Sequence, residues 1–198
     1  MIADINMWQS FLQGNKSSFE QLMKLHYKPL FNYGSKYSND AELVKDCIQE
    51  LFIGLWNRRT RLSTDVNPRP YLIASLRRAL HRKIQSESRL LKYKTDCLDH
   101  FNFEISVEQK IIDSESLQYI IKRIAEDMAK LPKRQKEVIY LKFFQNLSRD
   151  EIAKIMGNNP QTVSNLLQLA LKKLRVNIEC AIAIPIAVLL IFFIMIMT

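Results

Sequence analysis

The strongest constraint on the fold is a stretch of thirty residues, 146–175, which reads NLSRDEIAKIMGNNPQTVSNLLQLALKKLR. Ser148 and Glu151 have the spacing of a capping box, in which the hydroxyl and the carboxylate satisfy the first free amides of a helix. Gly157 allows a tight turn, and Asn159 can cap a second helix whose first residue is a proline that needs no amide partner. Two short helices separated by a tight turn predict a helix-turn-helix.

The second helix of this pattern carries polar side chains suited to reading DNA. In a helix-turn-helix its N-terminal end enters the major groove, where short polar side chains reach base edges. The candidates for base contact are Gln161, Thr162, Ser164, Asn165 and Gln168. The cations expected to pair with phosphates are Lys172, Lys173 and Arg175, and the opposite, buried side is expected to hold Val163, Leu166, Leu167, Ala170 and Leu171. The competing interpretation is a helical hairpin with a solvated polar face.

Helical periodicity also dominates the rest of the chain. Apolar residues recur at helical spacing between residues 4 and 61, Pro68 and Pro70 break that pattern, and a new helix is expected from about Tyr71. The periodicity weakens between residues 87 and 114, which is typical of a linker, and then returns. We therefore predict an all-α fold class, with two small helical domains joined by a linker and followed by a C-terminal hydrophobic helix.

Positive charge is concentrated in two blocks of the chain, whose formal net charge is +9. Residues 67–94 contain eight Lys or Arg against one Glu, and residues 132–176 contain nine against three acidic residues. The residues between the two blocks are acidic on balance. This distribution favours a polyanionic partner at two places on the chain.

Cysteine and histidine spacings do not support a metal site, a disulfide framework or catalysis. The residues concerned are Cys47, Cys97, Cys180, His26, His81 and His100. They are scattered and follow no metal-ligand pattern, so we expect no metal, no cofactor and no enzymatic activity. The first residues lack a basic segment followed by an apolar run, so no secretory signal is expected and the body of the protein is expected in the cytoplasm.

Two parts of the chain resemble the sigma-70 family of bacterial RNA polymerase sigma factors. The segment LPKRQKEVIYLKFFQNLSRDEIAKIMGNNPQTVSNLLQLALKKLR resembles region 4 of that family, and DAELVKDCIQELFIGLWNRR with PYLIASLRRALHRKIQ resembles region 2. Their order, without the extra regions of housekeeping factors, is similar to the extracytoplasmic-function group. The resemblance implies region 2 at residues 1–90, a linker at 91–114 and region 4 at 115–178. Residues 179–198 then remain as an additional tail.

For the first block, the resemblance implies two binding surfaces. One is the helix that would dock the β′ clamp helices of core RNA polymerase, which carries Asp46, Gln49, Glu50, Phe52 and Trp56, and the other is the basic stretch that follows it. In addition to these two surfaces, the resemblance implies the β flap of the polymerase as a partner of the chain. Phe52 and Trp56 lie one helical turn apart and would be apolar anchors, although such a stripe is equally compatible with the domain core.

The minus-ten promoter element would be recognised and melted by the following basic stretch. Its candidate residues are Arg69, Tyr71, Arg77, Arg78, Arg82 and Lys83. Cations would hold a strand backbone while an extruded base stacks on the aromatic ring. Many members of the family have Asn where this chain has Arg78. The alternative is a solvated basic helix face without a partner.

The tail is the feature that the family pattern does not include. From residue 181 to residue 197 the chain contains 17 residues that are apolar or proline. As a helix this run would be about 26 Å long, slightly short of a hydrocarbon core of about 30 Å. We expect residues 181–198 to anchor the protein to the inner membrane as a single helix. A buried packing helix and a docking segment for a membrane partner are the alternatives.

Together these features predict a sigma factor that binds core RNA polymerase and directs DNA-templated transcription initiation by recognising and melting promoter DNA. An anti-sigma factor is a further candidate partner. One alternative is a helix-turn-helix DNA-binding regulator that forms no holoenzyme. Another is a membrane-bound adaptor whose basic faces meet anionic lipid.

Overall fold

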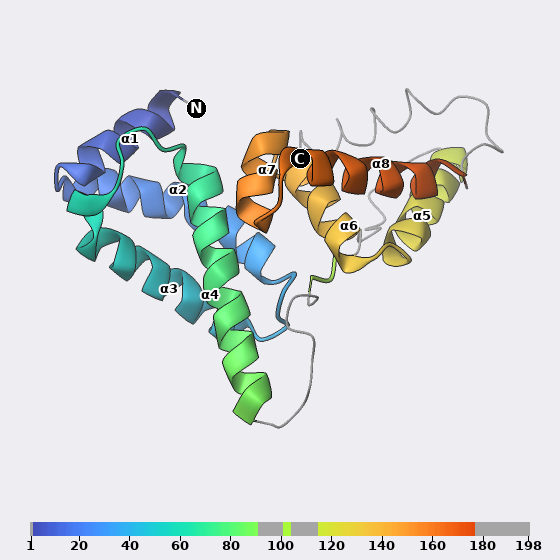
Figure 1. Ribbon diagram of the computed structural model, residues 1–198, viewed down its shortest axis with the longest axis horizontal. Helices are drawn as coiled ribbons and strands as arrows, with labels where there is room; N and C mark the ends of the chain where they lie inside the picture. Colours follow the sequence, from blue (N-terminus) through green and yellow to red (C-terminus); the bar gives the residue numbers. More distant parts are fainter. Residues whose placement is uncertain (1, 91–100, 104–114, 177–198) are drawn as a thin grey trace. The chain divides into compact units, whose positions relative to one another are not determined.

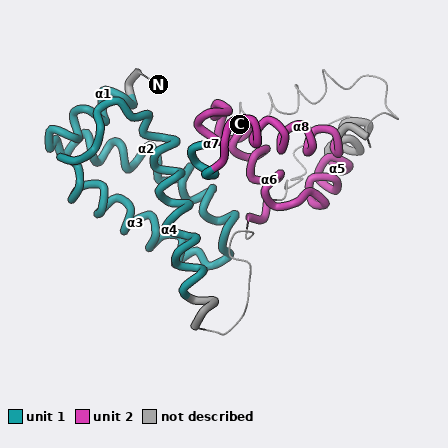
Figure 2. Tube along the Cα trace, in the orientation of Figure 1, with its two compact units in different colours: residues 1–100, 154–157 teal, residues 101–153, 158–198 magenta. Residues whose placement is uncertain are grey.

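The regular elements of the protein are helices throughout the residues that the computed structural model describes, which are 2–90, 101–103 and 115–176. The chain divides into two compact units, residues 1–100 with 154–157 and residues 101–153 with 158–198 (Figure 2). The all-α prediction is therefore confirmed. The hydrophobic helix predicted at 179–198 lies outside the described residues. Of the helices that are described, none combines the length and the apolar composition needed to cross a bilayer.

Four α-helices build the first unit (Figure 1). They are α1 (Ile2–Leu12), α2 (Lys16–Gly34), α3 (Ala41–Asn57) and α4 (Pro68–Leu90), with the 3-10 turn η1 (Arg59–Arg61) after α3. Helix α2 packs against the other three helices, and α3 also packs against α4. Helix α4 begins at Pro68, before the start predicted near Tyr71, because proline is tolerated in the first turn of a helix.

Side-chain caps and one close contact fix how these helices begin and meet. The Asn15 carboxamide accepts from the amide of Ser18 at the start of α2, and the Asp40 carboxylate accepts from the amides of Glu42 and Leu43 at the start of α3. At the end of α2, a Cβ on Gly34 would lie only 2.6 Å from a methyl group of Val44. The absence of a side chain at this position therefore lets α2 and α3 approach closely.

The second unit contains α5 (Glu115–Ala129), α6 (Lys133–Ile139), the start of α7 (Arg149–Met156) up to residue 153, and α8 (Pro160–Val176). Helix α8 packs against α5 and α6. Helix α6 continues into a π-helical turn, η2 (Tyr140–Phe144). Aromatic rings explain its packing, because Phe103 meets Tyr140 and Phe144 at centroid distances of 5.1 and 4.8 Å. Residues 101–103, predicted as linker, thus pack on this unit, and the rest of that segment lies outside the described residues.

The helix-turn-helix forms as its local sequence predicts. Ser148 and Glu151 make the reciprocal capping box, with distances of 2.9 Å from the Ser148 amide to Glu151 Oε2 and 3.3 Å from the Glu151 amide to Ser148 Oγ. Gly157 has a positive φ of 66°, and Asn159 Oδ1 accepts from the Thr162 amide at 2.7 Å. The turn and the first residues of α8 are therefore held by local hydrogen bonds.

A buried histidine lies in the interior of the first unit. His26 on α2 is 4% exposed, and its Nε2 atom is buried without a hydrogen-bond partner. Burial is the main cause that lowers the pKa of His26, the Arg69 guanidinium lowers it further, and the Asp4 carboxylate opposes both. The folded protein therefore favours the neutral imidazole.

We expect the first unit to lose stability as the pH falls below about 6.5, where histidine in the unfolded chain takes up a proton that folded His26 resists. The stability contribution of the neutral imidazole is thus present above that pH and is lost as the solution is acidified. Urea unfolding followed by tryptophan fluorescence reports on this unit, because both tryptophans, Trp8 and Trp56, belong to it. His26→Leu should flatten the pH dependence between 7.5 and 5.5. An identical slope in the variant would show that other groups cause it.

Candidate nucleic-acid interface and docking groove

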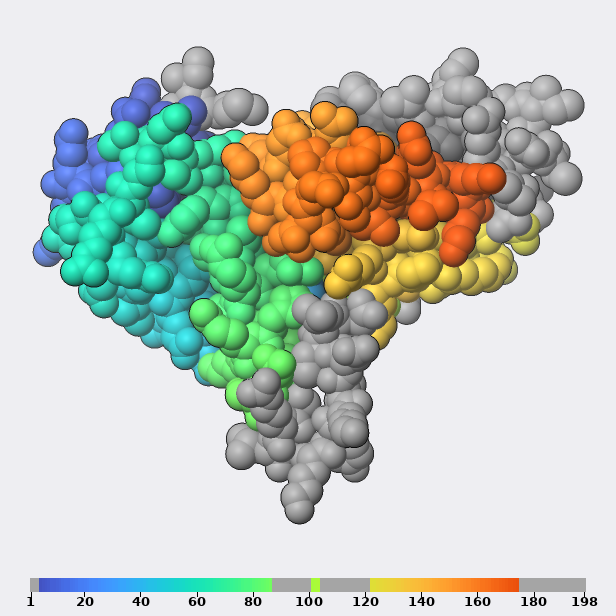
Figure 3. Space-filling model, viewed as in Figure 1, coloured from blue at the N-terminus to red at the C-terminus, as the bar shows by residue number. Residues whose placement is uncertain are grey.

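The N-terminal half of α8 presents three of the five predicted base-contacting residues to solvent. Gln161, Asn165 and Gln168 are exposed, and part of the α8 surface is visible in orange and red in Figure 3. Gln161 and Asn165 lie one helical turn apart, and Gln161 Nε2 donates to Asn165 Oδ1 at 3.1 Å. The two amide side chains therefore stand together on one face, with donors and acceptors that can reach base edges.

The other two predicted residues are used within the helix itself. Thr162 Oγ1 donates to Asn159 Oδ1 at 2.8 Å, in addition to the amide bond of the cap. Ser164 Oγ donates to the carbonyl oxygen of Pro160 at 3.2 Å. Both side chains are half-buried, and their hydroxyl groups form hydrogen bonds within the first turn of α8. They are therefore less available to a binding partner than the three exposed residues.

Further along α8, Lys172 and Lys173 are exposed as predicted, whereas the side chain of Arg175 lies outside the described residues. Val163 and Ala170 are buried, and Leu166 and Leu167 are half-buried. The prediction that Leu171 lies on the buried side is wrong, because that side chain is 41% exposed. The reason is helical geometry: Leu171 directly follows Ala170 and points about 100° away from it.

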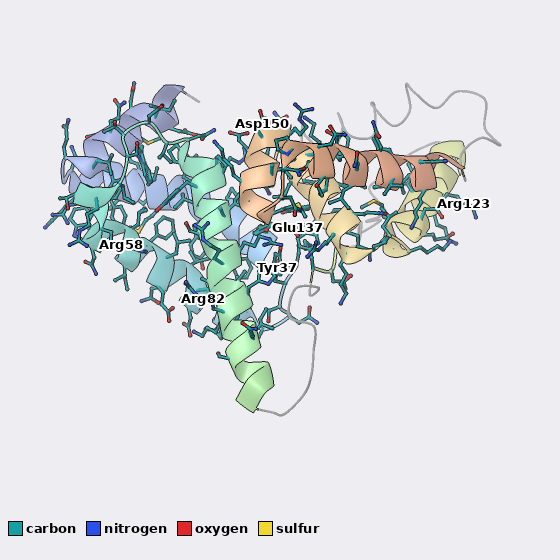
Figure 4. The ribbon with its side chains drawn as sticks, viewed as in Figure 1. Tyr37, Arg58, Arg82, Arg123, Glu137 and Asp150 are labelled. Carbon is teal, nitrogen blue, oxygen red and sulfur yellow. The ribbon has the colours of Figure 1, made fainter. Side chains whose placement is uncertain are left out.

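Two of the six residues predicted to contact the minus-ten element point into solvent. Arg78 and Arg82 are exposed on α4, one helical turn apart, and Arg82 is labelled in Figure 4. Arg78 Nη2 donates to the neighbouring Ser75 hydroxyl at 3.1 Å. These two guanidinium groups therefore form a cationic pair on one face of the helix.

The other three cations among the six candidates, Arg69, Arg77 and Lys83, lie against residues of the first unit. Arg77 is half-buried, and its Nε donates to the hydroxyl of Tyr37 at 3.1 Å. Lys83 Nζ lies 3.6 Å from a Glu50 carboxylate oxygen and 3.9 Å from one of Asp46. Arg69 is half-buried close to His26. These contacts orient the side chains, although partly exposed ion pairs contribute only about 0–1 kcal/mol each.

Tyr71, the aromatic residue predicted to stack on a base, is half-buried in the first turn of α4. One side of its ring meets the indole of Trp8 edge-on, with ring centroids 5.5 Å apart. The ring is therefore fixed by a contact with α1 while part of it remains exposed.

An apolar groove of about 800 Å³ lies between α2 and α3. Its walls include Phe19, Ile48, Phe52 and Trp56, and charged or polar residues such as Asp46 and Gln49 also line it. Phe52 is only 5% exposed, so it belongs to the domain core as well as to the groove wall, whereas Trp56 is half-buried. Phe52 therefore fits the core alternative considered from the sequence, whereas the role of the more accessible Trp56 as a docking anchor stays a prediction.

The polar residues predicted for polymerase docking all lie on α3, which forms one wall of this groove. Asp46, Gln49 and Glu50 are all exposed on α3, and Asp46 and Gln49 line the groove directly. Asp46 and Glu50 share Lys83 as an ionic partner. Of the five predicted residues, the structure thus brings four to the groove, and Glu50 lies one turn from Asp46.

Two residues of the groove were missed by the sequence reasoning. Ile53 is 54% exposed and Tyr27 is 43% exposed, and both line the groove. The available signal was the position of Ile53, an apolar residue directly after Phe52 on the side of α3 that otherwise carries Gln49 and Asn57. Because single exposed apolar residues are common on protein surfaces, this signal is weak, and it is the grouping of Ile53 with Phe19 and Trp56 in one groove that marks a contact surface.

No group of three or more His, Cys, Asp or Glu side chains is arranged to hold a metal ion in the described part of the chain. Cys97, His100 and Cys180 fall outside that part. The candidate sites in the described part of the chain are the polar face of α8, the exposed cations of α4 and the apolar groove.

Comparison with known proteins gives two family matches. Residues 22–90 match the family described as "Sigma-70 region 2", and residues 121–174 match "Sigma-70, region 4". The first match contains α3, α4 and the groove residues from Met23 onward, and the second contains α7 and α8 up to residue 174.

Individual relatives agree with these matches. The chain is 33% identical over 78 residues to RNA polymerase sigma factor SigV of Bacillus subtilis (strain 168), in a match that covers 35% of this chain and about half, 47%, of that relative. It is 25% identical over 171 residues to sigma factor YlaC of the same organism, covering 82% of this chain and 93% of YlaC. In fold, it is similar to the sigma factor RpoE from Bartonella quintana, solved with the anti-sigma factor NepR, with a TM-score of 0.57 at 20% identity over 82% of this chain and 98% of RpoE. From the two regions in this order and the sigma factors among its relatives, we conclude that the chain belongs to the sigma-70 family of RNA polymerase sigma factors.

Proposed function

We propose that this sigma factor binds core RNA polymerase through its first unit and directs transcription initiation by recognising and opening promoter DNA. The observation that carries the proposal is that one chain combines an apolar docking groove on α2 and α3 with a capped helix-turn-helix whose α8 exposes Gln161, Asn165 and Gln168. The chemistry of RNA synthesis then belongs to the polymerase. In this assignment residues 1–90 act as region 2, residues 91–114 as the linker and residues 115–178 as region 4.

The groove is the proposed docking site for the β′ clamp helices of core polymerase. A helix that lies in an apolar groove is held by a few large side chains, while polar residues at the rim set its orientation. Trp56 and Ile53 are the accessible apolar contacts, and Asp46 and Gln49 are the polar ones. Lys83 forms weak, partly exposed ion pairs with Asp46 and Glu50. Basic residues of the polymerase can therefore take the place of Lys83 with little loss of free energy. The second unit is the proposed partner of the β flap.

Contacts with the minus-ten element divide between strand binding and support. Arg78 and Arg82 are exposed and suited to phosphate contact, and the exposed side of Tyr71 is suited to stacking on an extruded base. Arg77 is tied to Tyr37, and Lys83 is tied to α3, so we assign both a supporting role. Arg69 precedes Tyr71 and stands at the start of α4.

For the minus-35 element, we propose that α8 enters the major groove by its N-terminal end. Gln161, Asn165 and Gln168 then read base edges, while Lys172, Lys173 and Arg175 contact phosphates. Thr162 and Ser164 keep the first turn of α8 in shape through their hydrogen bonds.

The hydrophobic tail and an anti-sigma factor are further parts of the proposal. Residues 181–197 contain no charged side chain, and Lys172, Lys173 and Arg175 precede them, which favours a membrane helix with its basic flank on the cytoplasmic side. An anti-sigma factor is proposed as a partner because the similar RpoE fold was solved with NepR bound.

We expect the purified wild-type chain to support run-off transcription by core polymerase and Ile53→Glu to abolish it. A glutamate at this half-exposed position would put a charge into an apolar contact, and we expect the Kd for core polymerase to rise at least tenfold, or about 1.4 kcal/mol. Leu25→Glu is the matched control, because Leu25 is 47% exposed on α2 but does not line the groove. Loss of transcription without loss of core binding would place the contact elsewhere, and a wild-type chain that binds no core polymerase would favour the plain DNA-binding regulator.

Replacing Gln161 or Asn165 by Ala should change which minus-35 sequences are preferred, with a cost of about 1–3 kcal/mol at the cognate base pair. Lys172→Ala should instead weaken binding to all duplexes similarly. The slope of log K against log salt concentration should fall in magnitude by about 1, because one phosphate contact is lost. Lys133→Ala, at an exposed lysine of α6, is the matched control for loss of charge. Holoenzyme binding to a library of duplexes at two salt concentrations measures both effects. Equal effects of all four variants on every duplex would contradict base readout.

Deletion of residues 181–198 should move the protein from the membrane fraction to the soluble fraction of the cell, because about 17 apolar residues are lost from contact with lipid. Run-off transcription by the shortened chain serves as the control that both units remain folded. An unchanged distribution between the fractions would rule out the anchor. Vesicle binding that persists after the deletion, without any promoter preference, would favour the lipid-bound adaptor.

A further inference from the structure

Helix α1 carries some of the most deeply buried side chains of the first unit, although neither family match includes it. Trp8 and Phe11 are both fully buried, while the region 2 match begins at residue 22. Burial of two large aromatic side chains is a strong contribution to packing. The position of α1 therefore affects how the elements that Trp8 and Phe11 contact are packed.

Trp8 contacts the chain on both sides of the entry into α4. Its indole Nε1–H donates to the carbonyl oxygen of Ser63 at 3.0 Å, and its ring meets Tyr71 edge-on at 5.5 Å. Ser63 precedes α4, and Tyr71 lies in its first turn. One side chain of α1 thus joins the segment before α4 to the aromatic residue proposed to stack on promoter DNA.

Backbone hydrogen bonds hold both ends of the segment between η1 and α4, residues 62–67: the Leu62 amide donates to the carbonyl oxygen of Arg59 at 3.3 Å, and the Tyr71 amide donates to the carbonyl oxygen of Asn67 at 3.4 Å. Its middle residues Ser63, Thr64 and Asp65 are exposed, and a local bond joins the Asp65 amide to Ser63 Oγ at 3.2 Å. A connection without regular secondary structure has access to many backbone conformations. The bond from a buried indole to the Ser63 carbonyl therefore restricts this loop, because the indole cannot move without disturbing the core.

We propose that Trp8 is a positioning residue for promoter opening, which holds the 62–67 loop and the Tyr71 ring in the geometry that binds the displaced promoter strand. This inference rests on the proposed function of α4. A strand-binding surface that is ordered in advance loses less conformational entropy when the strand binds. Trp8 acts through the loop and Tyr71 and does not itself touch DNA, because it is fully buried.

The test compares two variants of the full chain. Trp8→Phe keeps an aromatic ring in the core but removes the N–H donor to Ser63, and Trp8→Leu, which also lacks a donor, is the second variant should the first fail to fold. Leu80→Ala is the matched control: Leu80 is fully buried in α4 and lies about 13 Å along the helix from Tyr71. It weakens the core of the same unit without removing a contact of the loop.

Hydrogen exchange of the amides in residues 62–67 measures the loop directly. We expect Trp8→Phe to speed this exchange by about three- to tenfold, the scale of one hydrogen bond. Within holoenzyme, the Kd for a single-stranded minus-ten oligonucleotide should rise by a similar factor, while the affinities for core polymerase and for a minus-35 duplex stay within twofold of wild type. Leu80→Ala should lower the thermal midpoint and leave loop exchange and oligonucleotide affinity within twofold.

The outcomes separate this inference from the function on which it rests. Unchanged loop exchange in Trp8→Phe overturns the anchoring, and faster exchange with unchanged oligonucleotide affinity overturns the positioning role. Equal weakening by Leu80→Ala reduces Trp8 to an ordinary core residue. A wild-type chain that binds neither core polymerase nor the oligonucleotide contradicts the proposed function itself, and with it the role of Trp8 in promoter opening, while the exchange data still report whether Trp8 holds the loop.

Discussion

The first unit depends on a continuous group of aromatic rings that joins its helices. Trp8 contacts Phe11, Phe11 stacks on Phe19 at 5.2 Å, and Phe19 meets Trp56 at 5.0 Å. These rings come from α1, α2 and α3, and Trp8 extends the group to Tyr71 on α4. Because aromatic pairs prefer offset or edge-on geometries, each ring restricts the orientation of the next. The walls of the apolar groove and the start of α4 are consequently parts of one packed core.

Charge is distributed on this core in a way that composition alone does not reveal. Most of the cations of α4 were predicted to form a single DNA-facing patch, yet Arg77 is bonded to Tyr37, and Lys83 lies against the carboxylates of α3. Only Arg78 and Arg82 are fully turned to solvent among the six candidates. The cationic surface is therefore smaller than the charge count implies, and the remaining cations support the residues around it.

The turn and the helix starts of the helix-turn-helix, unlike the core of the first unit, are fixed by residues that are close in sequence. The capping box, the positive φ of Gly157 and the Asn159 cap all act within a few residues of one another. The exposed amides of Gln161 and Asn165 then follow from the helical repeat. This local control suits an element that must present a constant polar face, because its shape does not rely on contacts that a bound partner could disturb.

The sequence by itself determined the all-helical class, the helix-turn-helix and its caps, and the resemblance to both sigma regions, because helical periodicity, capping and turn chemistry act over a few residues. Only the tertiary structure decided which side chains from different helices meet: it placed Phe52 in the core and paired Lys83 with Asp46 and Glu50. It also joined Trp8 to Ser63, 55 residues along the chain. These facts depend on how helices distant in sequence pack against one another, and no local pattern carries that information.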